Sequence, residues 1–69
     1  MPGKYGETTV GVCVVRAEAD ASAGLTITVT ARPDVDDDAG ESVLHTASIA
    51  AALAKVGEFL AAAERKSAT

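Results

Sequence analysis

Aromatic residues are scarce in this sequence: its 69 residues include no tryptophan, one phenylalanine (Phe59) and one tyrosine (Tyr5). A hydrophobic core must therefore be built from valine, leucine, isoleucine and alanine, which bury less area per side chain than aromatic residues do. A chain of this length buries only about 60% of the surface that it exposes when unfolded. We expect a single small domain spanning residues 1–69, with a thin core that would gain stability from association with another chain.

Cysteine occurs once, as Cys13, and asparagine and glutamine do not occur at all. A single cysteine forms no disulfide within the chain, so nothing here indicates an oxidising compartment. Without asparagine or glutamine, the chain lacks the side chains that read adenine through paired hydrogen bonds. The net charge of −4 also disfavours binding to a phosphate backbone. We therefore expect no nucleic-acid partner.

Long apolar runs are also missing. No run approaches the roughly 18 residues that cross a bilayer, and residues 1–6 contain no apolar signal-peptide core. We expect a cytoplasmic protein without a membrane partner. The alanine-rich composition, without asparagine or glutamine, is typical of bacteria with GC-rich genomes.

Apolar and polar residues alternate from Leu25 to Arg32, which predicts a strand with one buried face. The valine-rich segment from Val10 to Ala19 precedes it, and the turn-like residues 20–24 join the two into an antiparallel hairpin. If Ala19 pairs with Leu25, one face of this hairpin forms the core, whereas a slip of one residue would exchange the faces. The predicted core face carries Cys13, Val15, Ala17, Ala19, Leu25, Ile27, Val29 and Ala31.

The opposite face of the hairpin should need a partner, because one helix covers only one side of a sheet. The partner could be a second copy of the chain or another protein; an ordinary exposed surface of β-branched residues is the remaining alternative. The first strand would also be an edge, so edge pairing is a second way for copies to associate. The candidate interface residues are Val10, Val12, Val14, Arg16, Thr28, Thr30 and Arg32.

Beyond Pro33, which ends the second strand, the polar residues 34–40 predict a solvated loop, and residues 42–46 can return as a short third strand. From Ile49 the apolar period becomes helical, with Ser48 as the N-cap. The stripe predicted to pack on the sheet comprises Ile49, Ala52, Leu53, Val56, Phe59, Leu60 and Ala63. The predicted class is α+β: a two- or three-stranded antiparallel sheet packed on one C-terminal helix, with residues 1–7 and 66–69 flexible.

The acidic loop contains the pattern closest to a metal site. Asp34, Asp36 and Asp38 match positions 1, 3 and 5 of a calcium loop. However, Ala39 stands where glycine is required and His45 where a bidentate glutamate is required, so we expect no cation site and no cofactor. No nucleophile can be placed beside the single histidine, so we expect no enzyme. The candidate contacts of this loop to a basic partner are Asp34, Asp36, Asp37 and Asp38.

The order of elements is similar to that of the HicB antitoxin family, in which a truncated ribonuclease-H-like sheet precedes a helix. The likeness covers the middle and end of the chain, including a helix reading Thr46-Ala-Ser-Ile-Ala-Ala-Ala-Leu53. That family carries a Pro-Asp-x-x-Gly-Cys loop; here Pro33-Asp34 occurs without the Gly-Cys, and we expect no DNA-binding tail. The resemblance implies an antitoxin or inhibitor that binds a basic protein. The residue pattern itself favours a non-enzymatic interaction module that forms a homodimer through its sheet.

Overall fold

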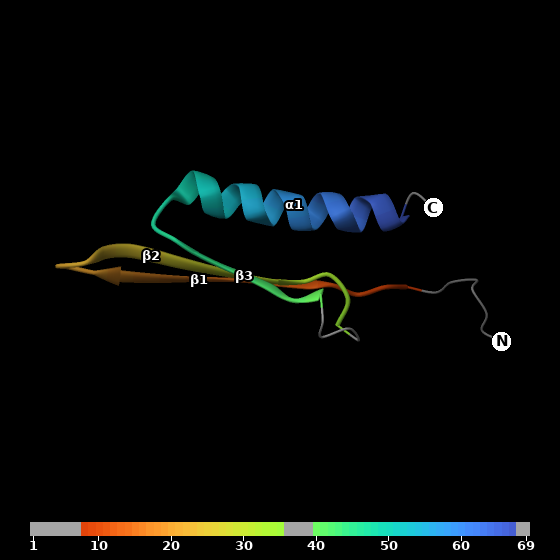
Figure 1. The fold of residues 1–69 in the computed structure, drawn as a ribbon, viewed down its shortest axis with the longest axis horizontal. Coiled ribbons are helices and arrows are strands. Elements are labelled where there is room, and N and C mark those ends of the chain that lie inside the picture. Colours follow the sequence, from red (N-terminus) through yellow and green to blue (C-terminus); the bar gives the residue numbers. More distant parts are fainter. Residues whose placement is uncertain (1–7, 36–39, 68–69) are drawn as a thin grey trace.

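The computed structural model describes residues 8–35 and 40–67 of the chain. They form three strands, β1 (Val12–Asp20), β2 (Gly24–Arg32) and β3 (Ser42–Thr46), followed by one helix, α1 (Ile49–Ser67). The sheet is an antiparallel meander in the order β1-β2-β3, and α1 lies along one of its faces (Figure 1). The predicted α+β class is confirmed, and the third strand is present.

The β1–β2 hairpin has the predicted register, with Ala19 paired with Leu25. Its turn is held by the side chain of Asp20, whose Oδ1 accepts hydrogen bonds from the backbone N–H groups of Ala23 (3.0 Å) and Ser22 (2.8 Å). These bonds, together with one from the Ser22 hydroxyl, hold the pKa of the Asp20 carboxyl below its ordinary value. Gly24 follows with φ at 85°, a left-handed conformation that favours glycine.

The start of α1 is fixed by two side-chain hydrogen bonds. Ala51 N–H donates to Ser48 Oγ at 3.1 Å, which confirms Ser48 as the N-cap. Ser48 N–H in turn donates to Thr46 Oγ1 at 3.0 Å, so the end of β3 and the first turn of the helix are tied together. At its other end α1 extends to Ser67, further than the sequence indicated. The expected flexibility of residues 1–7, 68 and 69 concerns residues outside the described part of the chain.

The core between the sheet and the helix is small. Its buried residues are Ile27, Val29 and Ala31 of β2 and Ala52 of α1. Half-buried side chains pack around Ile27, Val29 and Ala52, and these are Cys13, Leu25, Leu44 and Val56. Because the residues that face α1 have odd numbers in β1 and β2, the predicted assignment of residues to the two faces is confirmed. The expectation that Val15, Ala17 and Ala19 are core residues is wrong, because the helix leaves this part of β1 exposed.

The prediction that the whole apolar stripe of the helix packs on the sheet is wrong. Ile49, Leu53 and Leu60 expose 61%, 66% and 58% of their surfaces, whereas Ala52 is buried and Val56 is half-buried. The physical reason is the position of α1: the helix contacts β2 and β3 and leaves most of β1 uncovered, so one side of its apolar stripe has little sheet to pack on.

Candidate interaction surface

One face of the sheet, which we call the outer face, is turned away from α1, and none of the described helices or strands covers it (Figure 1). Alternation along the strands and the observed pairing bring residues of β1 and β2 together here. Six of the predicted interface residues lie on this face: Val12, Val14, Arg16, Thr28, Thr30 and Arg32. The structure therefore places these predicted residues on one surface.

The seventh predicted residue, Val10, lies just before β1 and is 53% exposed. Its carbonyl accepts a hydrogen bond of 2.9 Å from the N–H of Val35, so the segments flanking the two long strands lie side by side. Gly11 permits this approach, because a Cβ at that position would lie only 2.7 Å from the carbonyl oxygen of Pro33. Val35 is thereby brought to the outer face beside β1.

The apolar end of the outer face is slightly hollowed. Two strand valines, Val12 and Val14, are 43% and 54% exposed, and Val35 is 37% exposed. A hollow of about 210 Å³ is lined by Val12, Val14, Thr30, Arg32, Val35 and Glu41. Arg32 Nη2 and Glu41 Oε1 form an ion pair of 3.0 Å there. The hollow is mostly aliphatic and offers a second protein chain a surface for apolar contact.

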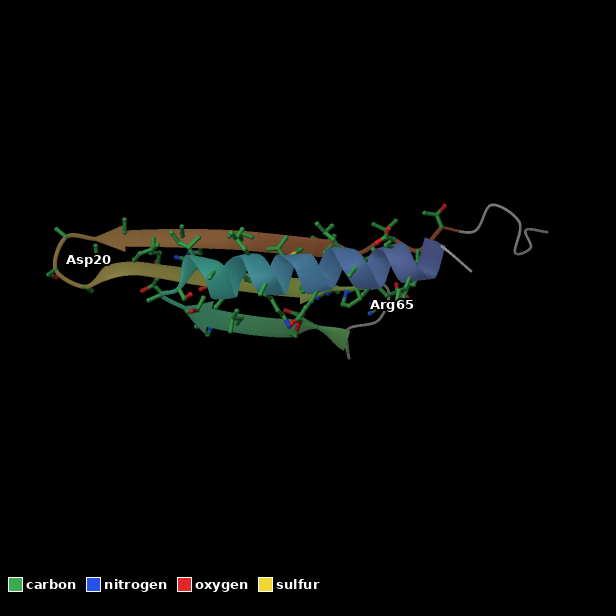
Figure 2. All side chains as sticks on the ribbon, turned by 90° about the horizontal axis from the view of Figure 1, so that it is seen from above. Asp20 and Arg65 are labelled. Carbon is green, nitrogen blue, oxygen red and sulfur yellow. The ribbon has the colours of Figure 1, made fainter. Side chains whose placement is uncertain are left out.

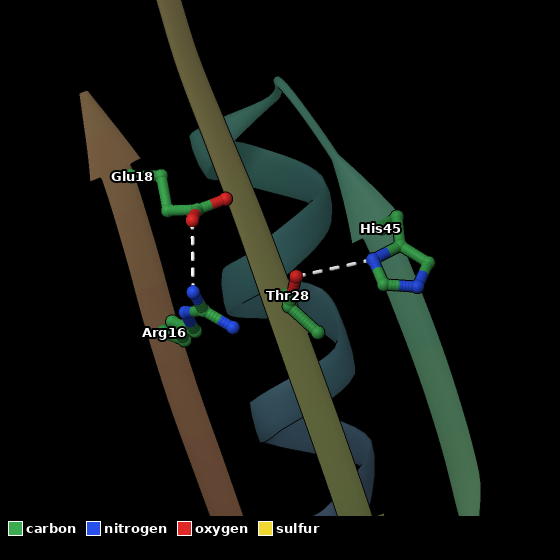
Figure 3. A network of polar contacts seen from close by, with 4 residues as sticks. All are labelled: Arg16, Glu18, Thr28 and His45. Atoms are coloured by element: carbon green, nitrogen blue, oxygen red, sulfur yellow. Dashed lines mark hydrogen bonds and ion pairs between the residues drawn. The ribbon is translucent and has the colours of Figure 1, made fainter. Parts of the chain in front are cut away.

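The other end of the outer face, toward the hairpin turn, is polar. Arg16 Nη2 and Glu18 Oε2 form an ion pair of 2.8 Å along β1, and Thr28 Oγ1 lies 3.0 Å from His45 Nδ1 (Figure 3). The Arg16 and Glu18 side chains are 72% and 59% exposed, so this pair contributes little to stability. It does place one positive and one negative group side by side on the surface.

Sequence reasoning missed two residues of this surface, Val43 and His45. In β3 they pair with Thr30 and Thr28, so they lie on the outer face, and Val43 is 51% exposed. The available signal was alternation in the third strand. If Leu44 faces the core, its two neighbours must face outward.

The structure describes one of the four predicted contact residues of the acidic loop. Asp34 is half-buried, while Asp36, Asp37 and Asp38 lie outside the described residues. Their contact to a basic partner stays a prediction. In the part of the chain that the structure describes, no three or more His, Cys, Asp or Glu side chains are grouped so that they could hold a metal ion. Nor does any helix among these residues have the length and apolar character required to cross a membrane.

Comparisons with protein-family models, with curated proteins and with solved structures found no match for the chain. The similarity to the HicB antitoxin family thus rests on the order of elements alone, and the inhibitor function that it implies stays a prediction. Function must be inferred from the surfaces that the fold leaves open.

Proposed function

We propose that this chain is a non-enzymatic protein–protein interaction module that associates with a second copy of itself through the outer face of its sheet. The observation that carries the proposal is where the large aliphatic side chains lie. Among the described residues, Ile27 and Val29 are the buried ones. The exposed ones are Val10, Val12, Val14, Val15, Val35, Val43, Ile49, Leu53 and Leu60. Scattered exposure of this kind is ordinary, but a contiguous apolar patch indicates an interaction site.

Five of these exposed valines belong to the outer face and its border: Val10, Val12, Val14, Val35 and Val43. Two sheets pack face to face at about 10 Å, with their side chains interdigitating. A second copy is a suitable occupant, because it presents the same aliphatic surface together with the same pair of opposite charges at Arg16 and Glu18. Burial of this patch would supply the apolar contact that the small core lacks.

The experiment is sedimentation equilibrium of the chain and of its Val12→Glu variant. We expect the unmodified chain to show a mass of at least twice 6.9 kDa, and V12E to lose the contact made by this face. Since Val12 is already 43% exposed, the substitution leaves the core intact, which far-ultraviolet circular dichroism would check. Val43→Glu, on the neighbouring edge of the same face, should act in the same way.

The matched control is Ala54→Glu, which makes the same change in charge at an exposed position of α1. This variant should associate as the unmodified chain does. If V12E and V43E associate as strongly as A54E, the outer face is not the contact and the proposal fails.

A further inference from the structure

A second apolar surface lies on the helix side of the sheet. Val15 in β1 is 54% exposed there, although it faces the same side as its pairing partner Val29, which is 0% exposed. On α1, the exposed residues Ile49, Leu53 and Leu60 form a second aliphatic group, which we call the aliphatic flank. Neither group belongs to the outer face.

The aliphatic flank and Val15 lie on the same side of the molecule. On the other side of α1, Lys55, Glu58 and Phe59 border a hollow together with Ser42 of β3. Successive helix residues are rotated by about 100°, which places the flank opposite these residues and therefore toward β1. Seen from the helix side, β1 runs along one border of the molecule and β3 along the other (Figure 2).

β1 is the edge strand beneath this flank. Among the described residues its only neighbour is β2, so the backbone N–H and C=O groups of alternate residues face outward along the strand. It contains neither proline nor lysine, two residues that commonly prevent an edge from pairing. The charged side chains of Arg16 and Glu18 lie on the outer face and leave the helix side of this edge apolar.

We infer that two copies of this chain pair antiparallel through β1, with the aliphatic flanks of both helices packed together over the paired Val15 residues. The result is one continuous sheet of six strands, built from two three-stranded sheets, with both helices on one face. The contact uses the β1 edge and the flank of α1. It is therefore separate from the outer face and goes beyond the function proposed above.

The charges of β1 exclude two registers, and the position of α1 selects among the others. A two-fold axis perpendicular to the sheet sets one residue opposite its own copy, and an axis at Arg16 or Glu18 would oppose like charges. An axis at Val15 sets Val15 against Val15 of the second copy, Arg16 against Val14, and Glu18 against Val12. No two like charges are then opposite each other, and residues 12–18 of both copies are paired.

The aliphatic flank of the helix is centred on the same two-fold axis at Val15. Val29 is the pairing partner of Val15 and packs in one cluster with Ala52, the residue before Leu53. Leu53, in the middle of the flank, thus lies level with Val15, and the axis brings Leu53 of the two copies together. The nine-residue strand is about 30 Å long and the 19-residue helix about 28 Å. Stable dimers usually bury about 800 Å² per partner, and an interface of that area is about as wide as this strand and helix are long.

Cysteine cross-linking tests this geometry. With Cys13→Ala as the background, we would introduce Leu53→Cys, Ala54→Cys or Val43→Cys and treat each purified protein with a short thiol-to-thiol cross-linker. Leu53→Cys should give covalent dimers in high yield, and the adjacent Ala54→Cys, on the exposed side of α1, should give few. Equal yields at these two positions would indicate random collision and overturn the inference.

The Val43→Cys protein separates this inference from the proposed function. In a face-to-face contact of outer faces, Val43 lies inside the interface while the two Leu53 residues lie on opposite outer sides. Cross-linking at Val43 without cross-linking at Leu53 would overturn edge pairing and support the outer-face contact alone. Cross-linking at Leu53 supports edge pairing, whatever the result at Val43.

A second measurement uses Leu53→Glu, again with Ala54→Glu as its control. Because Leu53 is 66% exposed in the protomer, the substitution removes little burial within one copy. Two Leu53 residues meet at the axis, and each central aliphatic anchor is worth about tenfold in affinity, so the dissociation constant of the edge dimer should rise roughly 100-fold. An unchanged dissociation constant for L53E would overturn the inference, including when V43E weakens association.

Discussion

Val15 and Val29 are paired across β1 and β2 and face the same side of the sheet, yet Val29 is fully buried and Val15 is 54% exposed. The helix covers the middle strand and leaves the first strand open on that side. The outer face is open as well, so β1 beyond Cys13 lacks cover on both faces, and the strand has a free edge among the described residues. The open surfaces of the molecule are thus concentrated on this strand.

The two valines should respond differently to truncation. Val29→Ala removes fully buried methyl groups and should lower the free energy of unfolding by roughly 2 kcal/mol. Val15→Ala should cost less than about 1 kcal/mol at concentrations where the chain is monomeric. Urea unfolding of dilute protein would measure both, and equal losses would contradict the observed difference in burial.

The N-cap of α1 should contribute measurably to stability. Ser48→Ala removes the acceptor of the Ala51 N–H and should lower the free energy of unfolding by about 1 kcal/mol. Ser48→Asp keeps an acceptor at the same place and serves as the matched variant, with stability close to that of the unmodified chain. Thermal or urea unfolding of the three proteins would measure these differences in stability. If S48A and S48D were equally stable, the cap would have no energetic role.

Two glycines should have opposite effects when replaced by alanine. Gly24→Ala forces a side chain into a left-handed conformation with φ near 85° and should destabilise the hairpin by about 1–2 kcal/mol. Gly57→Ala adds a methyl group that meets no atom within 4 Å and improves helix propensity, so it should stabilise the chain by up to about 1 kcal/mol. The comparison requires dilute, monomeric protein. If Gly57→Ala destabilised the monomeric protein, the result would contradict the open space that the structure shows around Gly57.

Asp20 should make the stability of the hairpin depend on pH. Hydrogen bonds from Ala23 and Ser22 lower the pKa of its carboxyl in the folded state, so the charged form is favoured by folding. This contribution is complete at pH 7 and disappears as the pH falls from about 4, the ordinary value, through the lower folded-state pKa.

The matched variant for Asp20 is Asp20→Asn, which keeps an oxygen acceptor but does not titrate. The unmodified chain should lose stability relative to D20N as the pH falls through this range, as measured by thermal unfolding. A difference between the two proteins that is the same at pH 7 and pH 3 would exclude Asp20 as the source.

The elements and the hairpin register could be predicted because they depend on local patterns. Alternation around Ile27 fixes the strand, and the Ser48 cap fixes the start of the helix. The rotation of α1 about its axis could not be predicted, because a stripe as wide as that from Leu53 to Phe59 allows several packing angles. The contact that Ala52 makes with Ile27 and Val29 selects one of them and leaves Leu53 exposed.

The outer face was predicted from alternation along both hairpin strands, which sets Val12 and Val14 beside Thr28 and Thr30. Residues 42–46 were predicted as a possible third strand, but their faces were not assigned, because so short a segment does not define a register from sequence. The contribution of Val35 depends on its backbone hydrogen bond to Val10, a contact between segments 25 residues apart that no local pattern encodes.

Sedimentation equilibrium of the unmodified chain over a wide concentration range decides whether the chain self-associates. We expect a mass of at least twice 6.9 kDa at high concentration, falling toward 6.9 kDa on dilution. A constant mass of 6.9 kDa at every concentration would contradict both the outer-face contact and the pairing of β1 edges.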